Sequence, residues 1–135
     1  MKISARVTNG RGKHAVLLKT GEHEHSLPIA PKTDGLGSSV NGGELLFLAL
    51  ATCYCNDIYR EARKRGIEVR GVEVEVEGTF GAEGEGAREI RYRANVDADA
   101  PREEVLALMR HTDTVAEIQN TLRAGTPVML TDGTP

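Results

Sequence analysis

The sequence predicts an α+β fold in which antiparallel strands surround one long helix. Three observations support this. Apolar and polar side chains alternate in residues 2–9, 71–80 and 89–96, as they do in half-buried strands. Residues 44–65 form one long stretch without glycine or proline whose first half is almost entirely apolar. Two shorter amphipathic stretches follow within residues 101–123. Runs of strands around a few helices are typical of the α+β class, and the predicted order is βββ-α-ββ-α-α-β.

Three strands are expected at the N-terminal end, at residues 2–9, about 13–20 and about 22–29. The Asn9-Gly10 pair between the first two is a strong signal for a hairpin turn. The segment that follows, residues 31–43, is rich in glycine and long for a connection. Loops of this length often have a function, so we expect it to contribute to a site or to a contact between subunits.

Residues 44–65 are predicted to form a central helix. Its first half is apolar nearly all round, and a helix that is apolar on every face must be buried on every face. The second half turns polar and ends in basic residues, which suit the negative end of the helix dipole. Gly66 then provides a C-terminal stop.

The second half of the chain predicts a hairpin followed by two helices and a final strand. Residues 71–80 and 89–96 would pair so that a stripe of glutamates faces a stripe of arginines on the solvated side of the sheet. Pro101 suits the first turn of a helix that runs to about residue 111. A second short helix is expected at about 113–123, and a last strand at 126–132.

Length and charge exclude several classes of function. The 135 residues suggest a single domain, 1–135, that is large enough to fold unaided. The net charge of -3 gives no reason to expect nucleic acid or a membrane as a partner. We see neither a signal-peptide core nor an apolar run long enough to cross a bilayer, so we expect a cytoplasmic protein with reduced thiols.

The only two cysteines, Cys53 and Cys55, lie in the predicted central helix. Residues two apart on a helix point about 200° away from each other. The pair therefore cannot form a disulfide or bind one metal ion together from a regular helix. One reactive thiol and two buried core thiols both stay open, and free cysteine is among the most buried residue types. His23 and His25 share one face of a strand, but no third ligand is evident, so we expect no metal and no cofactor.

Four segments together resemble the OsmC/Ohr family, the osmotically inducible and organic hydroperoxide resistance proteins. They are GLGSSVNGG, ELLFLALATC, GIEVRGVEVEVEG and EIQNTLRAGTPVML, and the resemblance extends from about residue 2 to 132. It implies an intertwined homodimer with two long central helices packed together. A buried position between two subunits would explain a helix that is apolar all round.

The resemblance also implies a chemistry, the reduction of organic hydroperoxides by a pair of cysteines. Cys53 matches the cysteine that attacks the peroxide, and Cys55 matches no family residue. The second family cysteine would stand at Ala116, so the chain resembles a divergent member without it. We therefore expect one-cysteine reduction of hydroperoxides with an external thiol reductant. The alternative is a non-catalytic dimer that binds a small apolar or thiol-bearing ligand at the subunit interface.

In the hydroperoxide-specific branch of the family, an arginine of the N-terminal hairpin activates the cysteine and is held by a glutamate near the helix start. Arg11 is the best positional match for this arginine, and Arg6 is the second choice. The glutamate position itself falls on Gly43, so Glu44 is the nearest acidic residue. The resemblance thus implies catalytic roles for Cys53, Arg11 and Glu44, although Glu44 can also simply favour the helix N-terminus.

Overall fold

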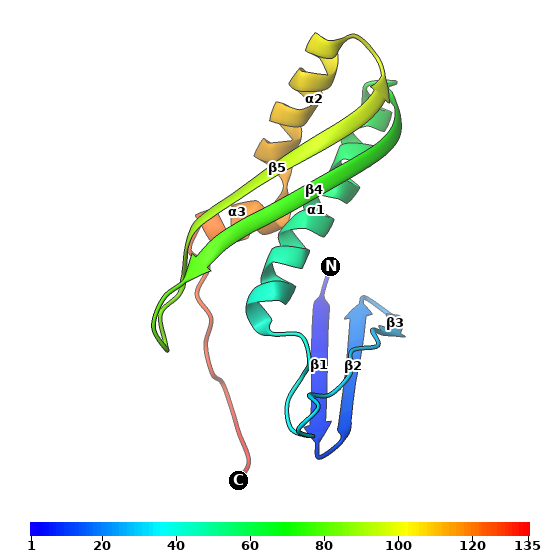
Figure 1. Cartoon of the computed structure of the whole chain (residues 1–135). Helices are drawn as coiled ribbons and strands as arrows, with labels where there is room; N and C mark the ends of the chain where they lie inside the picture. Colours follow the sequence, from blue (N-terminus) through cyan, green and yellow to red (C-terminus); the bar gives the residue numbers. More distant parts are fainter. The chain divides into compact units, whose positions relative to one another are not determined.

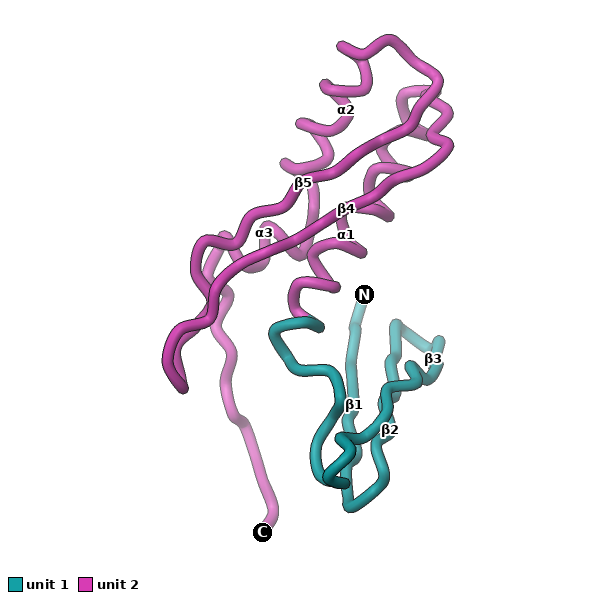
Figure 2. The backbone as a smooth tube through the Cα atoms, in the orientation of Figure 1, with its two compact units in different colours: residues 1–45 teal, residues 46–135 magenta.

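The computed structural model describes all residues, 1–135, and contains five strands and three helices (Figure 1). In chain order these are β1 (Ile3–Gly10), β2 (Lys13–Thr20), β3 (His23–Ser26), α1 (Gly42–Lys64), β4 (Glu68–Phe80), β5 (Ala87–Asp99), α2 (Arg102–Val115) and α3 (Glu117–Arg123). The α+β class and the order of these eight elements confirm the prediction. The chain divides into two compact units, residues 1–45 and 46–135 (Figure 2), and each is described separately.

The predicted final strand at 126–132 is wrong for this chain on its own. The segment is extended but pairs with no other strand, and Val128 and Leu130 are 98% and 96% exposed. A strand is defined by hydrogen bonds to a neighbour, so a suitable composition alone does not produce one.

The first unit contains a three-stranded antiparallel sheet in the order β1-β2-β3. The turn between β1 and β2 includes Gly12, whose φ of 71° lies in the left-handed region that favours glycine. The glycine-rich loop folds back onto this turn, because the Gly12 amide donates a hydrogen bond to the Gly35 carbonyl at 2.6 Å. The unit therefore joins the first hairpin to the loop that leads into α1.

Helix α1 begins with a reciprocal pair of capping hydrogen bonds. The Glu44 amide donates to Asn41 Oδ1 at 2.8 Å, and the Asn41 amide donates to Glu44 Oε1 at 3.0 Å. Such a capping box satisfies two amides that the helix leaves free. At the other end, Gly66 has a φ of 66° and the Ile67 amide donates to the Ala62 carbonyl, which is a glycine-type helix stop as predicted.

The second unit packs two helices against a long hairpin. Strands β4 and β5 pair antiparallel over nearly their whole length and cross over α1 and α2 in Figure 1. The core consists of Tyr54, Ile58 and Ala62 on α1 and Leu108 on α2, and the inward-facing residues of the hairpin pack around them. The predicted alternation is confirmed, since Val72 and Val74 of β4 pack against this core and the glutamates between the valines are exposed.

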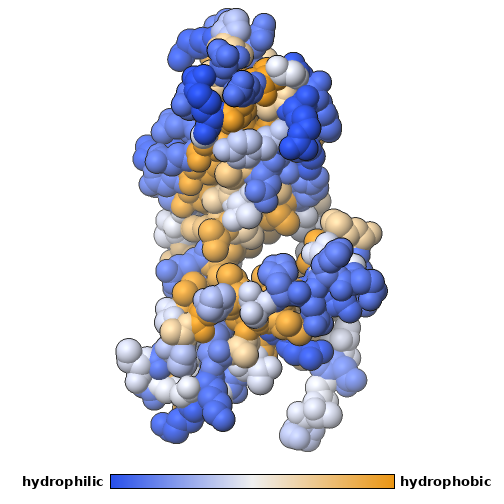
Figure 3. Space-filling view, turned by 90° about the vertical axis from the view of Figure 1, so that its right-hand side faces the viewer, coloured by the Kyte–Doolittle hydropathy of each residue, from blue (hydrophilic) through white to orange (hydrophobic).

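Only one side of α1 is buried by the chain itself. Leu50, Tyr54, Ile58 and Ala62 follow the four-residue spacing of a single helix face and are buried, whereas Leu48 is 55% exposed. Apolar side chains accordingly reach the surface in several places (Figure 3). None of the three helices has the length and apolar character needed to span a bilayer.

Candidate active site

Cys53 and Cys55 are both free thiols in the middle of α1, and both are partly buried. The helix is regular here, so the two side chains point in different directions, as the spacing predicts. Their surroundings differ. The sulfur of Cys53 contacts two carboxylates, whereas no hydrogen bond of Cys55 is present.

The two carboxylates that contact Cys53 come from two helices. Its sulfur lies 3.5 Å from Asp57 Oδ2, one turn further along α1, and 3.8 Å from Glu117 Oε2 at the start of α3. A thiol carries one proton and can donate it to one acceptor at a time. Asp57 is the closer acceptor, and it is buried, whereas Glu117 is exposed.

Arg60 holds the same two carboxylates from the other side. Its Nη1 lies 3.0 Å from Asp57 Oδ1 and 2.9 Å from Glu117 Oε1. Each carboxylate therefore turns one oxygen to the guanidinium and the other to the sulfur of Cys53. This arrangement joins α1 to α3 and orients both acid groups toward the thiol.

The surroundings of Cys53 favour the neutral thiol. Burial is the largest effect that raises its pKa, and the negative charges of Asp57 and Glu117 raise it further, whereas the backbone amide of Ile118 acts in the opposite direction. Reactive cysteines typically lie beside cations that lower the pKa. Arg60 does not have this effect at Cys53, because its guanidinium is engaged by the carboxylates.

The two carboxyl groups differ in their affinity for protons. Burial, followed by the hydrogen bond and negative charge of Glu117, raises the pKa of Asp57, and Arg60 opposes this shift only in part. The pKa of Glu117 is lowered, chiefly by its own backbone amide and also by Asp57 and Arg60. Asp57 is therefore the better proton acceptor of the pair.

A second ionic cluster lies one turn further along α1 and is centred on Glu61, which is 3% exposed. Its carboxylate accepts hydrogen bonds from Arg60, Lys64 and His111, each at 2.8 Å. These donors lower the pKa of Glu61 to about 2, against the opposing effect of burial. Because His111 belongs to α2, the cluster links the two helices of the core.

The low pKa of Glu61 predicts a loss of stability in acid. A carboxylate whose folded pKa lies below its unfolded value stabilises the folded state above the unfolded pKa, and this contribution is lost as the pH falls through the folded pKa. The unfolded value is about 4.3 and the folded value about 2, so the loss is expected between about pH 5 and pH 2. Urea unfolding across this range measures it. Glu61→Gln should be less stable at pH 7 and should approach the wild type near pH 2; an equal difference at every pH would contradict the prediction.

The sequence-predicted site residues belong to two different units of the chain. Cys53 belongs to the second unit, whereas Arg11, in the turn between β1 and β2, and Glu44, in the capping box of α1, belong to the first. Glu44 and Cys53 are nine residues apart, which places them about 14 Å apart along the helix axis and on opposite faces. Any action of Glu44 on Cys53 would therefore have to pass through another group such as Arg11, and both assignments stay predictions.

The residues that do contact Cys53 were not singled out from the sequence. Asp57 could have been found, since it lies four residues after Cys53 on the same helix face. Glu117 follows Ala116, the position at which the family resemblance places the second cysteine. Its contact with Cys53 shows that this part of the chain does reach the thiol. Ala116 itself is completely buried between α2 and α3, where its methyl group offers no redox chemistry.

The sulfur of Cys53 and the carboxylates of Asp57 and Glu117 are also the one group in the structure with metal-ligand geometry. Their ligand atoms all lie within 4.8 Å of one another. Both carboxylates, however, are already paired with the guanidinium of Arg60. A positive charge therefore already occupies this position, and we assign no metal ion to the group.

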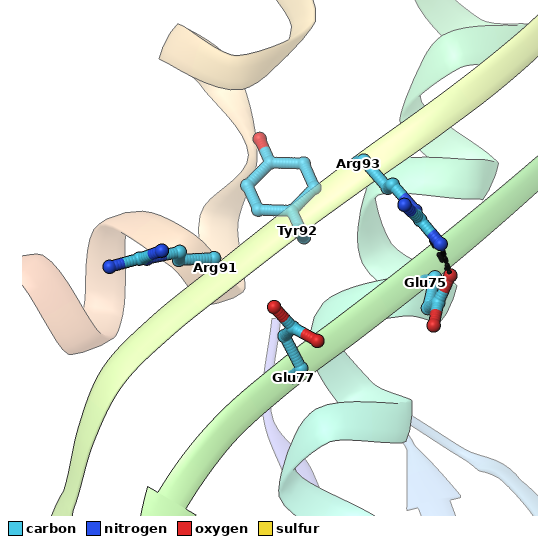
Figure 4. Close-up of a pocket in the computed structure, with 5 residues that line it drawn as sticks. All are labelled: Glu75, Glu77, Arg91, Tyr92 and Arg93. Atoms are coloured by element: carbon cyan, nitrogen blue, oxygen red, sulfur yellow. Dashed lines mark hydrogen bonds and ion pairs between the residues drawn. The ribbon is translucent and has the colours of Figure 1, made fainter.

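A hollow of about 220 Å³ lies on the hairpin and is lined by Glu75, Glu77, Arg91, Tyr92 and Arg93 (Figure 4). Arg93 Nε donates to Glu75 Oε2 at 3.0 Å, across the two strands. The hollow contains no thiol or free nucleophile. It corresponds to the solvated stripe of opposite charges that the sequence predicts, and we assign it no chemistry.

The order of the elements along the chain defines a class of protein, an α+β fold of the OsmC type in which a cysteine-bearing helix follows three strands and precedes a hairpin and two helices. The family model "OsmC-like protein" matches residues 35–131, which is more than half of the chain. The chain therefore belongs to the OsmC-like family. This confirms the resemblance found in the sequence. Comparison with curated protein sequences gives no match.

Solved structures show the same fold. An organic hydroperoxide resistance protein from Elizabethkingia anophelis is 22% identical, with a TM-score of 0.61 over 91% of this chain and 89% of that one. An OsmC-like protein from Mycoplasma pneumoniae is 19% identical, with a TM-score of 0.61 over 90% of this chain and 86% of that one. An organic hydroperoxide resistance protein from Legionella pneumophila is 21% identical, with a TM-score of 0.54 over 91% and 90%. At these identities the likeness establishes the fold.

Proposed function

We propose that the protein reduces organic hydroperoxides with a single cysteine, Cys53, and that an external thiol regenerates it. The observation that carries the proposal is a free, partly accessible thiol whose sulfur lies 3.5 Å from a carboxylate that can accept its proton. Membership of the OsmC-like family supports this function, as do fold relatives named as organic hydroperoxide resistance proteins.

The lack of a second cysteine determines how the cycle is completed. In the proposed reaction, the sulfur of Cys53 attacks the peroxide and becomes a sulfenic acid. Ala116 cannot supply a thiol, and Cys55 points away on the same helix. An external thiol therefore condenses with the sulfenic acid to a mixed disulfide and releases water, and a second external thiol restores Cys53.

The same proposal includes a homodimer in the cytoplasm. The apolar first half of α1 is covered only in part by the chain, and Leu48 is 55% exposed on it. Packing against a second copy would bury this surface. In such a dimer Arg11, held by Glu44, is the proposed source of positive charge for Cys53. Its approach would counteract the carboxylates that raise the pKa of the thiol.

An assay of peroxide consumption tests the proposal. Reduced protein is mixed with cumene hydroperoxide in the presence of a small dithiol, and loss of peroxide is followed beside an equal concentration of free cysteine. The expected result is faster consumption by the protein, with dimedone trapping a sulfenic acid at Cys53 when the dithiol is omitted. Consumption no faster than by free cysteine would refute the proposed peroxidase function.

One observation favours the alternative, a non-catalytic dimer that binds a small apolar or thiol-bearing molecule. Burial and the two neighbouring carboxylates raise the pKa of Cys53, and a neutral thiol is a weak nucleophile. A protein of this kind would leave cumene hydroperoxide unchanged. It would instead bind cumyl alcohol or a small thiol with a heat signal in titration calorimetry.

A further inference from the structure

In each of the two carboxylates beside Cys53, the two oxygens have different partners. One oxygen of Asp57 and one of Glu117 face the guanidinium of Arg60, at 3.0 and 2.9 Å. The remaining oxygens, Oδ2 and Oε2, face the sulfur, at 3.5 and 3.8 Å. The thiol thus has a proton acceptor already oriented by a fixed cation. Sequence reasoning assigned no role to these groups.

We propose that Asp57 is the proton-transfer residue of the Cys53 site, with Arg60 and Glu117 as the residues that position it. This inference rests on the proposed function, because it assigns a base to the same hydroperoxide reaction. Asp57 touches the reacting sulfur directly. Arg60 acts through the two carboxylates, and Glu117 supplies the second anchor for the guanidinium.

Asp57 is preferred over Glu117 for three reasons. It is nearer to the sulfur, and its side chain is only 8% exposed, compared with 63% for Glu117. Burial and the proximity of Glu117 also raise the pKa of Asp57, whereas that of Glu117 is lowered. A carboxylate with a raised pKa accepts a proton more readily and can later return it, as a general acid–base catalyst must.

The proposed step is balanced in atoms and electrons. Asp57 takes the S–H proton of Cys53 while the sulfur forms a bond to the terminal oxygen of the hydroperoxide. The O–O bond breaks, and the leaving alkoxide takes the proton from Asp57 to become an alcohol. Sulfur is oxidised by two electrons to the sulfenic acid, and the peroxide is reduced by two electrons. No ionised thiol needs to accumulate beforehand, which fits a site that disfavours the thiolate.

Charged groups from three helices surround this position. Helix α1, which bears Cys53, also supplies Asp57, Arg60, Glu61 and Lys64. Helix α2 supplies His111, and α3 supplies Glu117. Arg60 also donates to Glu61 at 2.8 Å, so the cation is shared between Asp57, Glu117 and Glu61. Lys64 and His111 are bonded to Glu61 rather than to Asp57. Asp57 is therefore the acceptor for the thiol proton, and Arg60 is the only cation paired with it.

Two reactions of the Cys53 thiol distinguish a proton-transfer role of Asp57 from a purely electrostatic role. Alkylation by iodoacetamide requires the thiolate but no proton for its leaving group. Reduction of cumene hydroperoxide requires a proton at the alkoxide. In a Cys55→Ser background, Asp57→Asn removes a negative charge beside the sulfur, so alkylation at pH 7 should become faster. Peroxide reduction should become slower, by about 100-fold, which is typical for loss of a general acid–base group.

Matched controls define the outcome. Glu117→Gln removes a similar charge but leaves the base, so it should also speed alkylation and should slow peroxide reduction much less than Asp57→Asn. Glu75→Gln, on the outer face of the hairpin, should change neither rate. If Asp57→Asn changes both rates in the same direction, or leaves peroxide reduction unaltered while the parent protein remains active, Asp57 is not the proton-transfer residue and the proposed function stands.

A measurement on the unaltered site covers the case in which Asp57→Asn fails to fold. Because Asp57 takes the thiol proton in the proposed step, peroxide reduction should rise less steeply with pH between about 6 and 8 than alkylation, which rises about tenfold per pH unit while the thiol is neutral. Parallel rises of both rates would overturn the role of Asp57. Peroxide reduction no faster than by free cysteine would overturn the role of Asp57 together with the proposed function.

Discussion

Replacement of Cys53 by serine is expected to reduce peroxide consumption to the rate of buffer with dithiol alone. The serine hydroxyl is close in size to the thiol, but it is not oxidised by hydroperoxides under these conditions and forms no sulfenic acid. The same variant should keep its fold, because Cys53 is only partly buried. Following the loss of cumene hydroperoxide, with circular dichroism as the check on folding, measures both properties.

The neighbouring cysteine provides a matched control. Cys55 lies two residues away on the same helix, and no carboxylate is bonded to its sulfur. Cys55→Ser should therefore consume peroxide at nearly the wild-type rate and should still be trapped by dimedone at Cys53. The assignment of Cys53 would be wrong if Cys55→Ser abolished the reaction while Cys53→Ser retained it.

Leu108→Ala is expected to destabilise the protein by about 2–5 kcal/mol. Leu108 is completely buried and is the residue of α2 that fills the core formed by Tyr54, Ile58 and Ala62 on α1. Its truncation removes apolar contacts and leaves a cavity between two helices and the hairpin. Urea unfolding monitored by circular dichroism should show a lower midpoint with an unchanged slope.

An exposed residue on the same helix provides the comparison for Leu108. Arg110 lies on the outer side of α2 and makes no ion pair. Arg110→Ala should change the free energy of unfolding by about 0.5 kcal/mol or less. If Leu108→Ala had an equally small effect, the packing of α2 against α1 would not have the importance that its burial indicates.

Local sequence patterns predicted the elements well where each element is determined by its own residues. The alternation in residues 71–80 and 89–96 gave strands that pair as β4 and β5, with Val72 opposite Val96. Gly66 ended α1 as expected, because only a residue without a side chain readily takes the left-handed conformation there. These features depend on contacts between residues that are close in sequence or within one hairpin.

The prediction of a final strand was wrong because a strand also depends on residues distant in the sequence. Residues 126–132 have a suitable composition, but a strand needs a partner, and the chain offers none to this segment. The surroundings of Cys53 could not be predicted for a similar reason. Glu117 lies 64 positions from Cys53, and no periodicity relates the two residues. Only the packing of α3 against α1 brings that carboxylate to the sulfur.

The sequence by itself determined the family, the position of Cys53 on a long helix, its separation from Cys55, and the alanine in place of a second cysteine. Helix geometry and a motif are local properties, so they can be read from adjacent residues. The tertiary structure alone decided what surrounds the thiol. Asp57, Arg60 and Glu117 meet because α1 and α3 pack together, and the charges that result give Cys53 an acidic environment rather than a basic one.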